Sequence, residues 1–209
     1  MSQTNYQTRN PARRAFEWEY KDATYEERKG DGDRAPRYLL LPTGEWANRV
    51  FIVGTLAEVV DSAENNQYVH GEVNDPTETG RFHIDAGQFQ PDAIAKMRRI
   101  ETPEMVAITG KTGVFDGDSG LKTKVRVTNI TPIPEALYDH WVADAAVKTM
   151  QRLETFGDDD NEAAKKAAEE YGTELGEYRD AAVDAIDRVQ DLIEEDPAEA
   201  DSAVETATD

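Results

Sequence analysis

Three basic residues alternate with uncharged residues in the segment 121–127. Because successive side chains of a β-strand point to opposite faces, Lys122, Lys124 and Arg126 would share one face, and the apolar residues between them would share the other. No Asp or Glu occurs anywhere in the segment 121–134. Such a row of cations suits contacts with phosphate groups, and an ordinary solvated strand face would show the same pattern.

A second alternating set lies upstream, where Tyr68, His70, Arg81 and His83 fall on exposed positions of two predicted strands. Aromatic rings can stack on nucleobases, at about 1–3 kcal/mol per base, and cations can contact the phosphates. Ordinary surface residues are the alternative interpretation. Further candidates for nucleic-acid contact are Arg49, Lys111 and Phe115, together with Trp46 and Phe89, although these aromatic residues also suit a core.

Other chemistry finds less support. His70, His83 and Asp85 offer two nitrogens and an oxygen to a metal, a minor alternative to ordinary surface roles. The segments 31–33 and 116–120 resemble calcium loops but lack the Glu at loop position 12, which predicts turns. No motif places a Ser–His–Asp arrangement or a carboxylate pair, and the chain has no cysteine. We therefore expect a non-catalytic protein without a cofactor or metal.

The elements that would position these residues follow the order β-β-β-α-β-β. The strands are predicted at 48–60, 68–73, 81–86, 105–115 and 121–130, and a short helix at 91–100 begins with Pro91 at its first turn. Gly54 marks a point where a barrel strand can bend sharply. This order predicts an α+β protein built on a five-stranded OB-fold barrel, a fold that binds oligonucleotides around its second and third strands. A sixth strand is predicted near 16–20, where Phe16, Trp18 and Tyr20 alternate with charged residues.

The chain becomes helical after Pro132. A helix is predicted over 134–156, and its amphipathic stripe is a candidate partner-binding surface made of Leu137, Trp141, Ala145, Leu153 and Phe156. A second, long helix is predicted over 161–195 with Asn161 as its cap, and small and apolar residues recur along it at alternating steps of four and three from Ala164 to Leu192. Gly172 and Gly176 weaken this seam, and we expect it to need a partner or the rest of the chain.

The predicted organisation is an N-terminal extension (1–33), the OB-fold (34–132), an amphipathic helix (133–157), a long acidic helix (158–196) and a disordered acidic tail (197–209). The 209 residues carry a formal net charge of −20, of which residues 1–132 hold −3 and residues 133–209 hold −17. Repulsion of this size is tolerable where concentrated salt screens it, which predicts a halophilic protein. The polar first residues and the lack of a long apolar run predict a cytoplasmic location and no membrane partner.

Two long stretches carry a resemblance to a known family. They read RAPRYLLLPTGEWANRVFIVGTL over 34–56 and VNDPTETGRFHIDAGQFQP over 73–91. They resemble the replication protein A family of haloarchaea, and more narrowly its small replication protein A-associated proteins, over about Ala15 to Phe156. The resemblance implies an OB-fold that binds single-stranded DNA, or supports a partner that does, in DNA replication and repair.

We therefore expect a single-stranded-DNA-binding subunit that joins the large replication protein A subunit, as a hetero-oligomer. Because counterion release weakens in concentrated salt, stacking or a partner must supply part of the affinity in a halophile. The alternative is an adaptor that stabilises the large subunit through its C-terminal helices without binding DNA. A metal-dependent nuclease is a more distant alternative.

Overall fold

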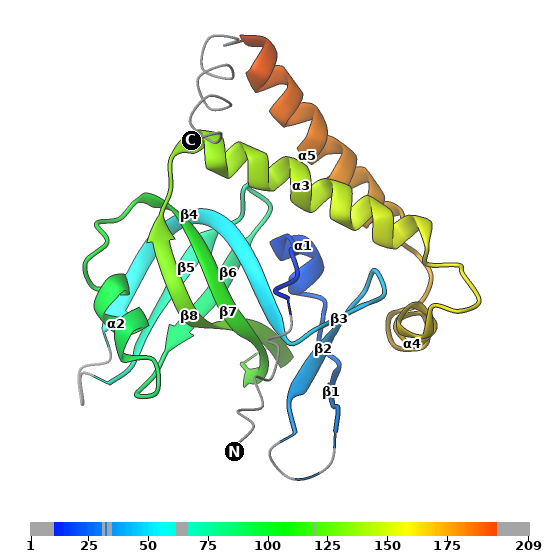
Figure 1. Ribbon diagram of the computed structural model, residues 1–209, viewed down its shortest axis with the longest axis horizontal. Helices are drawn as coiled ribbons and strands as arrows, with labels where there is room; N and C mark the ends of the chain where they lie inside the picture. The colour runs from blue at the N-terminus through cyan, green and yellow to red at the C-terminus, as the bar shows by residue number, and fades with distance from the viewer. Residues whose placement is uncertain (1–10, 31, 33–34, 62–66, 119, 196–209) are drawn as a thin grey trace, which may run out of the picture.

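The computed structural model describes residues 11–30, 32, 35–61, 67–118 and 120–195, so the predicted tail at 197–209 and most of the predicted loop at 31–33 lie outside the described residues. Five strands close into a barrel in the order β4-β5-β6-β8-β7, and α2 lies between β6 and β7 in the chain (Figure 1). Their bounds are Arg49–Asp61 (β4), Val69–Asn74 (β5), Arg81–Ala86 (β6), Pro91–Met97 (α2), Glu104–Gly117 (β7) and Gly120–Pro132 (β8). This is the OB-fold, as the sequence predicts.

The barrel is closed by a parallel pairing of β6 with β8, whereas its other neighbouring strands are antiparallel. Inward side chains of all five strands, including Ile52, Val73, Phe82, Ile108 and Val125, form one buried core. Gly54 allows β4 to lie close to β5, because a Cβ atom there would overlap the Asn74 carbonyl oxygen. The close approach of two strands thus requires glycine at this position, and the bend at Gly54 stays a prediction.

The predicted strand at 16–20 is wrong. Residues 17–20 form one helical turn, α1 (Glu17–Tyr20), and every residue in it is buried. Phe16 stacks on Trp18 with ring centroids 5.1 Å apart, and the Tyr20 hydroxyl donates a hydrogen bond to the Lys124 carbonyl at 2.7 Å. The alternation of apolar and charged residues wrongly predicted a half-exposed strand. The segment is enclosed on all sides, and its charged residues Glu17 and Glu19 are buried as well.

A small antiparallel sheet precedes the barrel. It consists of β1 (Glu26–Arg28), β2 (Arg37–Leu41) and β3 (Glu45–Ala47), in that order. β1 lies within the predicted N-terminal extension and pairs with β2 of the predicted OB-fold segment. The sheet therefore spans position 33, and the domain division placed there stays a prediction.

The C-terminal part of the chain forms three helices. They are α3 (Glu135–Glu154), α4 (Glu162–Tyr171) and α5 (Gly176–Glu195). The first matches the predicted helix, and Asn161 caps α4 by accepting a hydrogen bond from the Ala164 backbone N–H at 3.1 Å. The single helix predicted over 161–195 is wrong, because Gly172 ends α4 with a φ of 87° that other residues rarely adopt.

The two parts of the predicted seam therefore pack in different places. In α4, Ala164 lies against Gly44 of the β2–β3 turn, and the Tyr171 hydroxyl donates to the Leu40 carbonyl at 3.0 Å. In α5, Ala182 and Ala185 pack against α3. We expected the seam to need a partner or the rest of the chain. The rest of the chain supplies the packing, with the β2–β3 turn contacting α4 and α3 contacting α5.

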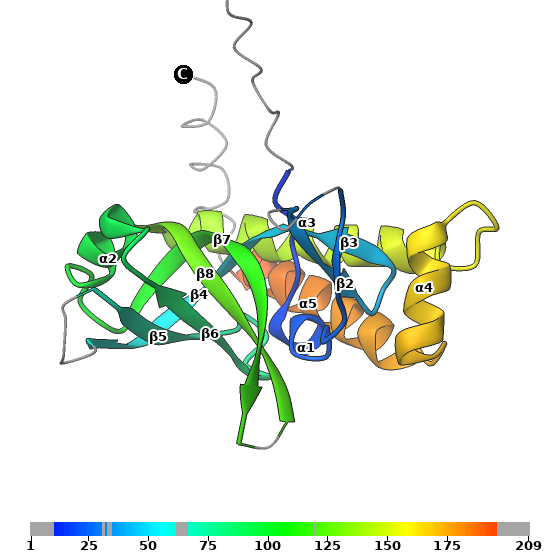
Figure 2. The same cartoon turned by 90° about the horizontal axis from the view of Figure 1, so that it is seen from below.

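A second core joins the helices to the barrel. Trp141 and Ala145 of α3 pack with Phe16 and Trp18 of the N-terminal segment, and with Val53 on the outer face of β4. Figures 1 and 2 show α3 and α5 lying along the same side of the barrel, with the N-terminal segment between them and the strands. The helices thus cover the outer face of β4 and part of β7.

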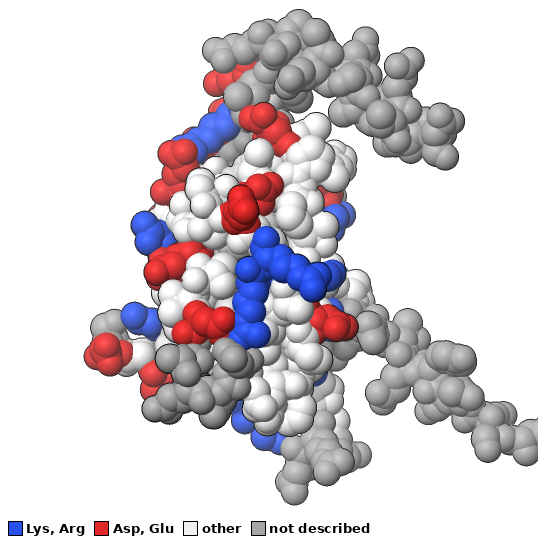
Figure 3. All heavy atoms as spheres, turned by 90° about the vertical axis from the view of Figure 1, so that its left-hand side faces the viewer, with Lys and Arg blue, Asp and Glu red and all other residues white. Residues whose placement is uncertain are grey.

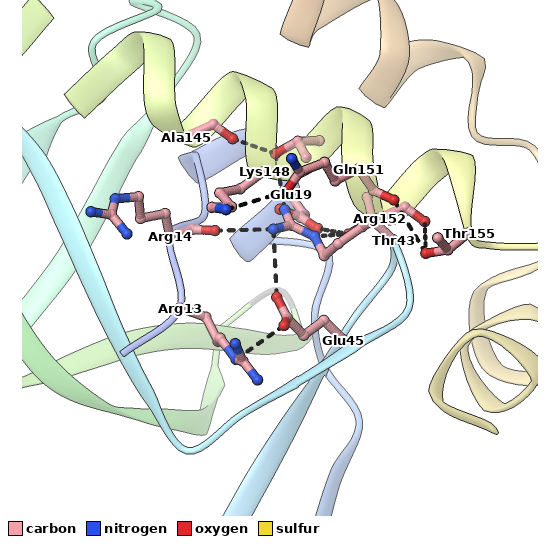
Figure 4. Close-up of polar contacts among 11 residues, drawn as sticks. Arg13, Arg14, Glu19, Thr43, Glu45, Ala145, Lys148, Gln151, Arg152 and Thr155 are labelled. Carbon is pink, nitrogen blue, oxygen red and sulfur yellow. Dashed lines mark hydrogen bonds and ion pairs between the residues drawn. The ribbon is translucent and has the colours of Figure 1, made fainter. Parts of the chain in front are cut away.

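A buried polar cluster holds α3 to the N-terminal segment (Figure 4). Arg152 donates from Nη2 to Glu19 Oε2 at 2.7 Å and from Nε to Thr43 Oγ1 at 2.6 Å, and Thr43 also donates to Glu19. Burial raises the pKa of the Glu19 carboxyl, and the neighbouring Arg152 opposes that effect. The cluster cross-links three segments that are far apart in the sequence.

Candidate nucleic-acid interface

A row of side chains crosses the outer face of the barrel. Cross-strand pairing places Arg49 opposite Lys111, Lys111 opposite Arg126, Arg126 opposite Asp85, and Asp85 opposite His70. Directly paired residues share one face of a sheet, so the row spans five strands, or about 19 Å at about 4.8 Å per strand. Four of these five residues are sequence-predicted DNA contacts, and the strand register makes them neighbours.

Asp85 binds two of the three cations predicted as a phosphate-binding row. Its carboxylate accepts hydrogen bonds from Arg126 Nε at 2.7 Å and Nη2 at 3.0 Å, and it pairs with Lys124 Nζ at 2.8 Å. The Asp85 side chain is only 2% exposed. Burial alone would raise its pKa, but the bonds from Arg126 and Lys124 outweigh burial and hold the pKa below its ordinary value. The sequence interpretation missed this partner because Asp85 lies about forty positions upstream.

The positive charge of Lys124 and Arg126 on this face is therefore partly neutralised by Asp85. Arg126 keeps 40% of its side chain exposed and Lys124 keeps 26%, so both remain accessible to a ligand. Lys122 forms no ion pair with any residue that the structure describes. Two cations set against one buried carboxylate, with Lys122 beside them, leave the face attractive to anions.

An aromatic side chain lies beside these cations. Phe115 of β7 is half-buried and pairs across the hairpin with Lys122 of β8. The His83 ring meets Phe115 edge-on at a centroid distance of 6.4 Å, and Lys124 Nζ lies 5.3 Å from its centroid. The hairpin that carries Phe115 and Lys122 extends beyond the end of the barrel (Figure 2). Phe115 thus combines a ring with the neighbouring cations Lys122 and Lys124, the combination that single-strand-binding surfaces use.

The β5–β6 hairpin carries the other predicted contacts. Arg81 Nη1 pairs with Glu72 Oε2 at 2.8 Å, and the His83 imidazole lies 3.8 Å from the same carboxylate. Tyr68 is 38% exposed, and its hydroxyl donates to Asp85 Oδ2 at 3.2 Å. His70 is exposed, with its ring 6.1 Å from that of Tyr68. These side chains lie on the same outer face as the row.

The remaining candidates lie elsewhere or have other partners. Trp46 belongs to the small β1–β3 sheet, where Lys29 Nζ lies 3.6 Å above its ring. Phe89 lies in the turn before α2 and is 81% exposed. Arg49 donates to Thr128 Oγ1 at 2.7 Å. Within the described ranges, no group of three His, Asp or Glu side chains is arranged to hold a metal, so the His70–His83–Asp85 alternative finds no donor set there.

The predicted partner-binding stripe on α3 faces inward over most of its length. Trp141, Ala145 and Leu153 are buried within this chain, and Phe156 is half-buried. Leu137 remains 54% exposed. The hydrophobic periodicity correctly predicted an amphipathic helix, but most of its apolar face packs against the rest of this chain. Within the stripe, Leu137 is the residue most accessible to a partner.

The α2 end of the molecule carries a basic surface that the sequence interpretation did not single out. Figure 3 shows a continuous group of Lys and Arg side chains near the middle of that side, with separate acidic groups and further single basic side chains around it. α2 and the residues after it contribute Lys96, Arg98 and Arg99 to this end. Arg98 forms a two-point ion pair with Asp61, both bonds 2.7 Å long. Clustering of basic residues at 96–99 is the sequence signal that was available.

Comparisons with known proteins found similarity in structure alone. No protein-family model matches the sequence, and no curated protein matches it. A chain of a replication protein A heterotrimer bound to ssDNA aligns with 14% identity and a TM-score of 0.45, covering 68% of this chain and 98% of that chain. A chain of the S. pombe Stn1–Ten1 complex aligns with 12% identity and a TM-score of 0.40, covering 62% and 84%.

The S. cerevisiae mitochondrial single-stranded DNA binding protein Rim1 aligns with 15% identity and a TM-score of 0.32, covering 41% of this chain and 92% of that chain. Matches with identities and TM-scores this low carry no argument about this chain, and the OB-fold is shown by the strand order of the barrel itself. Among the described residues, no helix is both long and apolar enough to cross a membrane.

Proposed function

We propose that the outer face of β5, β6 and β8, with the β7–β8 hairpin, binds single-stranded DNA. The observation that carries this proposal is the group formed by Phe115, His83 and Lys124, a ring with two basic neighbours on an accessible face of an OB-fold barrel. A base can stack on the ring while its phosphates contact Lys122 and Arg126. Nucleic acids are bound on this side of the OB-fold, around its second and third strands.

The cross-barrel row supports the same proposal. Like charges directly opposite each other in a sheet are unfavourable, and Lys111 lies between Arg49 and Arg126. A phosphate bound at this row relieves that repulsion. Asp85 limits the positive charge, so the electrostatic part of the affinity is moderate and stacking carries a larger share.

A fluorescence anisotropy titration with labelled oligo-dT tests the proposal. We expect binding that persists in molar KCl, because base stacking does not depend on counterion release. Phe115→Ala should weaken binding at every salt concentration, and Val147→Ala, which removes an exposed apolar side chain on α3, serves as the control. Binding that is absent at all salt concentrations, or equally sensitive to both variants, would contradict the proposal.

We further propose that the protein is a non-catalytic subunit of a replication protein A complex, acting in DNA replication and repair in the cytoplasm of a halophile. This finer assignment rests on the resemblance of the segments 34–56 and 73–91 and on the net charge of −20. Co-purification from a high-salt lysate, with mass identification of the associated chains, tests it. Recovery of the large single-strand-binding subunit is the expected result, and recovery of this chain alone would contradict it.

The alternative function is that of an adaptor that stabilises the large subunit without binding DNA. One observation favours it: Asp85 neutralises part of the positive charge on the proposed DNA face. Leu137 at the start of α3, 54% exposed, is then the first residue to test as a protein contact. Leu137→Glu should abolish complex formation if the adaptor function holds and leave oligo-dT binding unchanged if DNA binding holds.

A further inference from the structure

A groove of about 450 Å³ lies between residues 11–14 of the N-terminal segment and the C-terminal half of α3. Lys148 and Arg152 line it from α3, and because they are four positions apart they lie on one side of that helix. Glu45 of β3 also lines the groove. Figure 4 shows these three side chains together with Arg13 and Arg14.

The lining of the groove is basic. Its positively charged residues are Arg13, Arg14, Lys148 and Arg152, and Glu45 is the one acidic residue that lines it in the described part of the chain. The whole chain carries a formal net charge of −20, so this local excess of cations runs against its overall composition. A concave surface lined mainly by one sign of charge attracts ions of the opposite sign.

Three of the four cations are accessible. Arg13 Nε pairs with Glu45 Oε1 at 3.0 Å, and 40% of the Arg13 side chain is exposed. Arg14 Nε pairs with Asp144 Oδ2 at 2.7 Å, and 33% of the Arg14 side chain is exposed. Lys148 is exposed and forms no ion pair with any residue that the structure describes. An anion that enters the groove therefore meets one unpaired cation and two that are shared with carboxylates.

The groove begins where the cross-barrel row ends. Arg49 is the last residue of that row, and the Arg13 backbone N–H donates to the Arg49 carbonyl at 2.9 Å. Residues 11–14 thus lie beside β4, about one strand spacing, or about 4.8 Å, beyond Arg49. The Arg14 guanidinium lies 5.3 Å from the ring centroid of Phe51, which shares the outer face of β4 with Arg49. Arg14 is therefore on the same face as the row.

We propose that a bound single strand continues past Arg49 into this groove, where Arg13, Arg14 and Lys148 bind its phosphates. The inference rests on the proposed single-stranded-DNA function and extends it to a contact surface outside the barrel. Proteins that bind single strands without sequence preference follow the backbone with a positively charged groove. The groove beside Arg49 supplies such a surface in line with the row.

The test compares two exposed lysines that differ in position. Lys148→Gln removes a cation from the groove, and Lys165→Gln makes the same change in charge on α4, where Lys165 pairs with Glu162. In anisotropy titrations with a twelve-residue oligo-dT, Lys148→Gln should bind about fivefold more weakly at about 0.2 M KCl and nearly normally at about 2 M, because one lost phosphate contact lowers the salt slope by about 0.7. Lys165→Gln should match the unmodified protein at both concentrations.

A third variant should change the affinity in the opposite direction. Glu45→Gln removes the carboxylate that pairs with Arg13, so oligo-dT should bind more tightly in moderate salt and with a steeper salt slope. A gain in affinity cannot come from a damaged fold. Failure of either result, with oligo-dT still bound and still sensitive to Phe115→Ala, would overturn the inference and leave the proposed function intact. No binding of oligo-dT by the unmodified protein would overturn both.

Discussion

Asp85 and Arg126 lie directly opposite each other on the parallel strands β6 and β8 and form a two-point ion pair, with bonds of 2.7 and 3.0 Å. The pair lies at the stretch where β6 and β8 are in register, so it belongs to barrel closure as well as to the proposed DNA face. A phosphate that approaches Arg126 competes with a carboxylate already in place. On the proposed function, we expect this competition to set how DNA binding responds to salt.

Asp85→Asn should strengthen binding to oligo-dT in moderate salt, because Arg126 and Lys124 lose their shared anion. The slope of log affinity against log salt should steepen by about 0.7 for each additional phosphate that these cations bind. Anisotropy titrations across a salt series measure both quantities. Asp116→Asn, an exposed acid of the same hairpin, is the control. An unchanged slope in Asp85→Asn would mean that neither cation contacts the strand.

Phe115→Ala and Lys122→Ala should separate as the salt concentration changes. The first should cost about 1–3 kcal/mol of binding free energy at all salt concentrations, because it removes a stacking surface. The second should matter in moderate salt and little in molar salt, because it removes a cation that forms no ion pair with the described residues. Parallel salt titrations of the two variants measure this, and identical salt responses would contradict the division of roles.

Glu17→Gln should stabilise the protein at pH 8 and have a small effect near pH 5. Burial, assisted by the nearby Asp75 and opposed by Lys21, raises the pKa of Glu17 from 4.5 to about 7. Between these values the folded state binds more protons than the unfolded state, so stability falls as pH rises and the full penalty is present above pH 7. The penalty is roughly 2–3 kcal/mol. Urea unfolding of both proteins at the two pH values measures it, and an equal difference at pH 5 and pH 8 would contradict it.

Arg152→Met should destabilise the fold by about 3–5 kcal/mol, because it leaves the fully buried Glu19 without its ion-pair partner. The double variant Arg152→Met with Glu19→Gln should recover much of that loss, since no buried charge remains. Urea unfolding midpoints measure both effects. Lys148→Met on the exposed side of α3 is the control and should change stability little. A double variant no more stable than Arg152→Met alone would show that the loss comes from packing rather than from the unpaired charge.

The barrel was predictable because its strands follow rules that act locally. Alternation along β8 placed Lys122, Lys124 and Arg126 on one face and Val125 on the other, and the structure confirms that division. The order of strands and helix was enough to indicate the OB-fold. The prediction of one long helix was wrong because the seam of small residues continued across Gly172 and Gly176, and the regular spacing was given more weight than these two glycines.

The proposed DNA face was only partly predictable, because its neighbours are set by strand register. Nothing near Asp85 in the sequence shows that it lies opposite Arg126, and nothing near Lys111 shows that it lies between two arginines. The burial of the Glu17 side chain was not predictable for the same reason. Glu17 lies on α1, where the sequence indicated a strand with exposed charged residues.

The burial of residues 16–20 beneath α3 also constrains the order in which parts of the chain can fold during synthesis. Phe16 and Trp18 pack with Trp141, and Glu19 is paired with Arg152, more than 120 positions later. The segment near Phe16 leaves the ribosome before α3, so its binding site does not exist until α3 has emerged. The barrel strands can pair in the meantime. The segment near Phe16 is therefore made before α3 but reaches its final packing only after α3, and its aromatic residues need protection from aggregation until then.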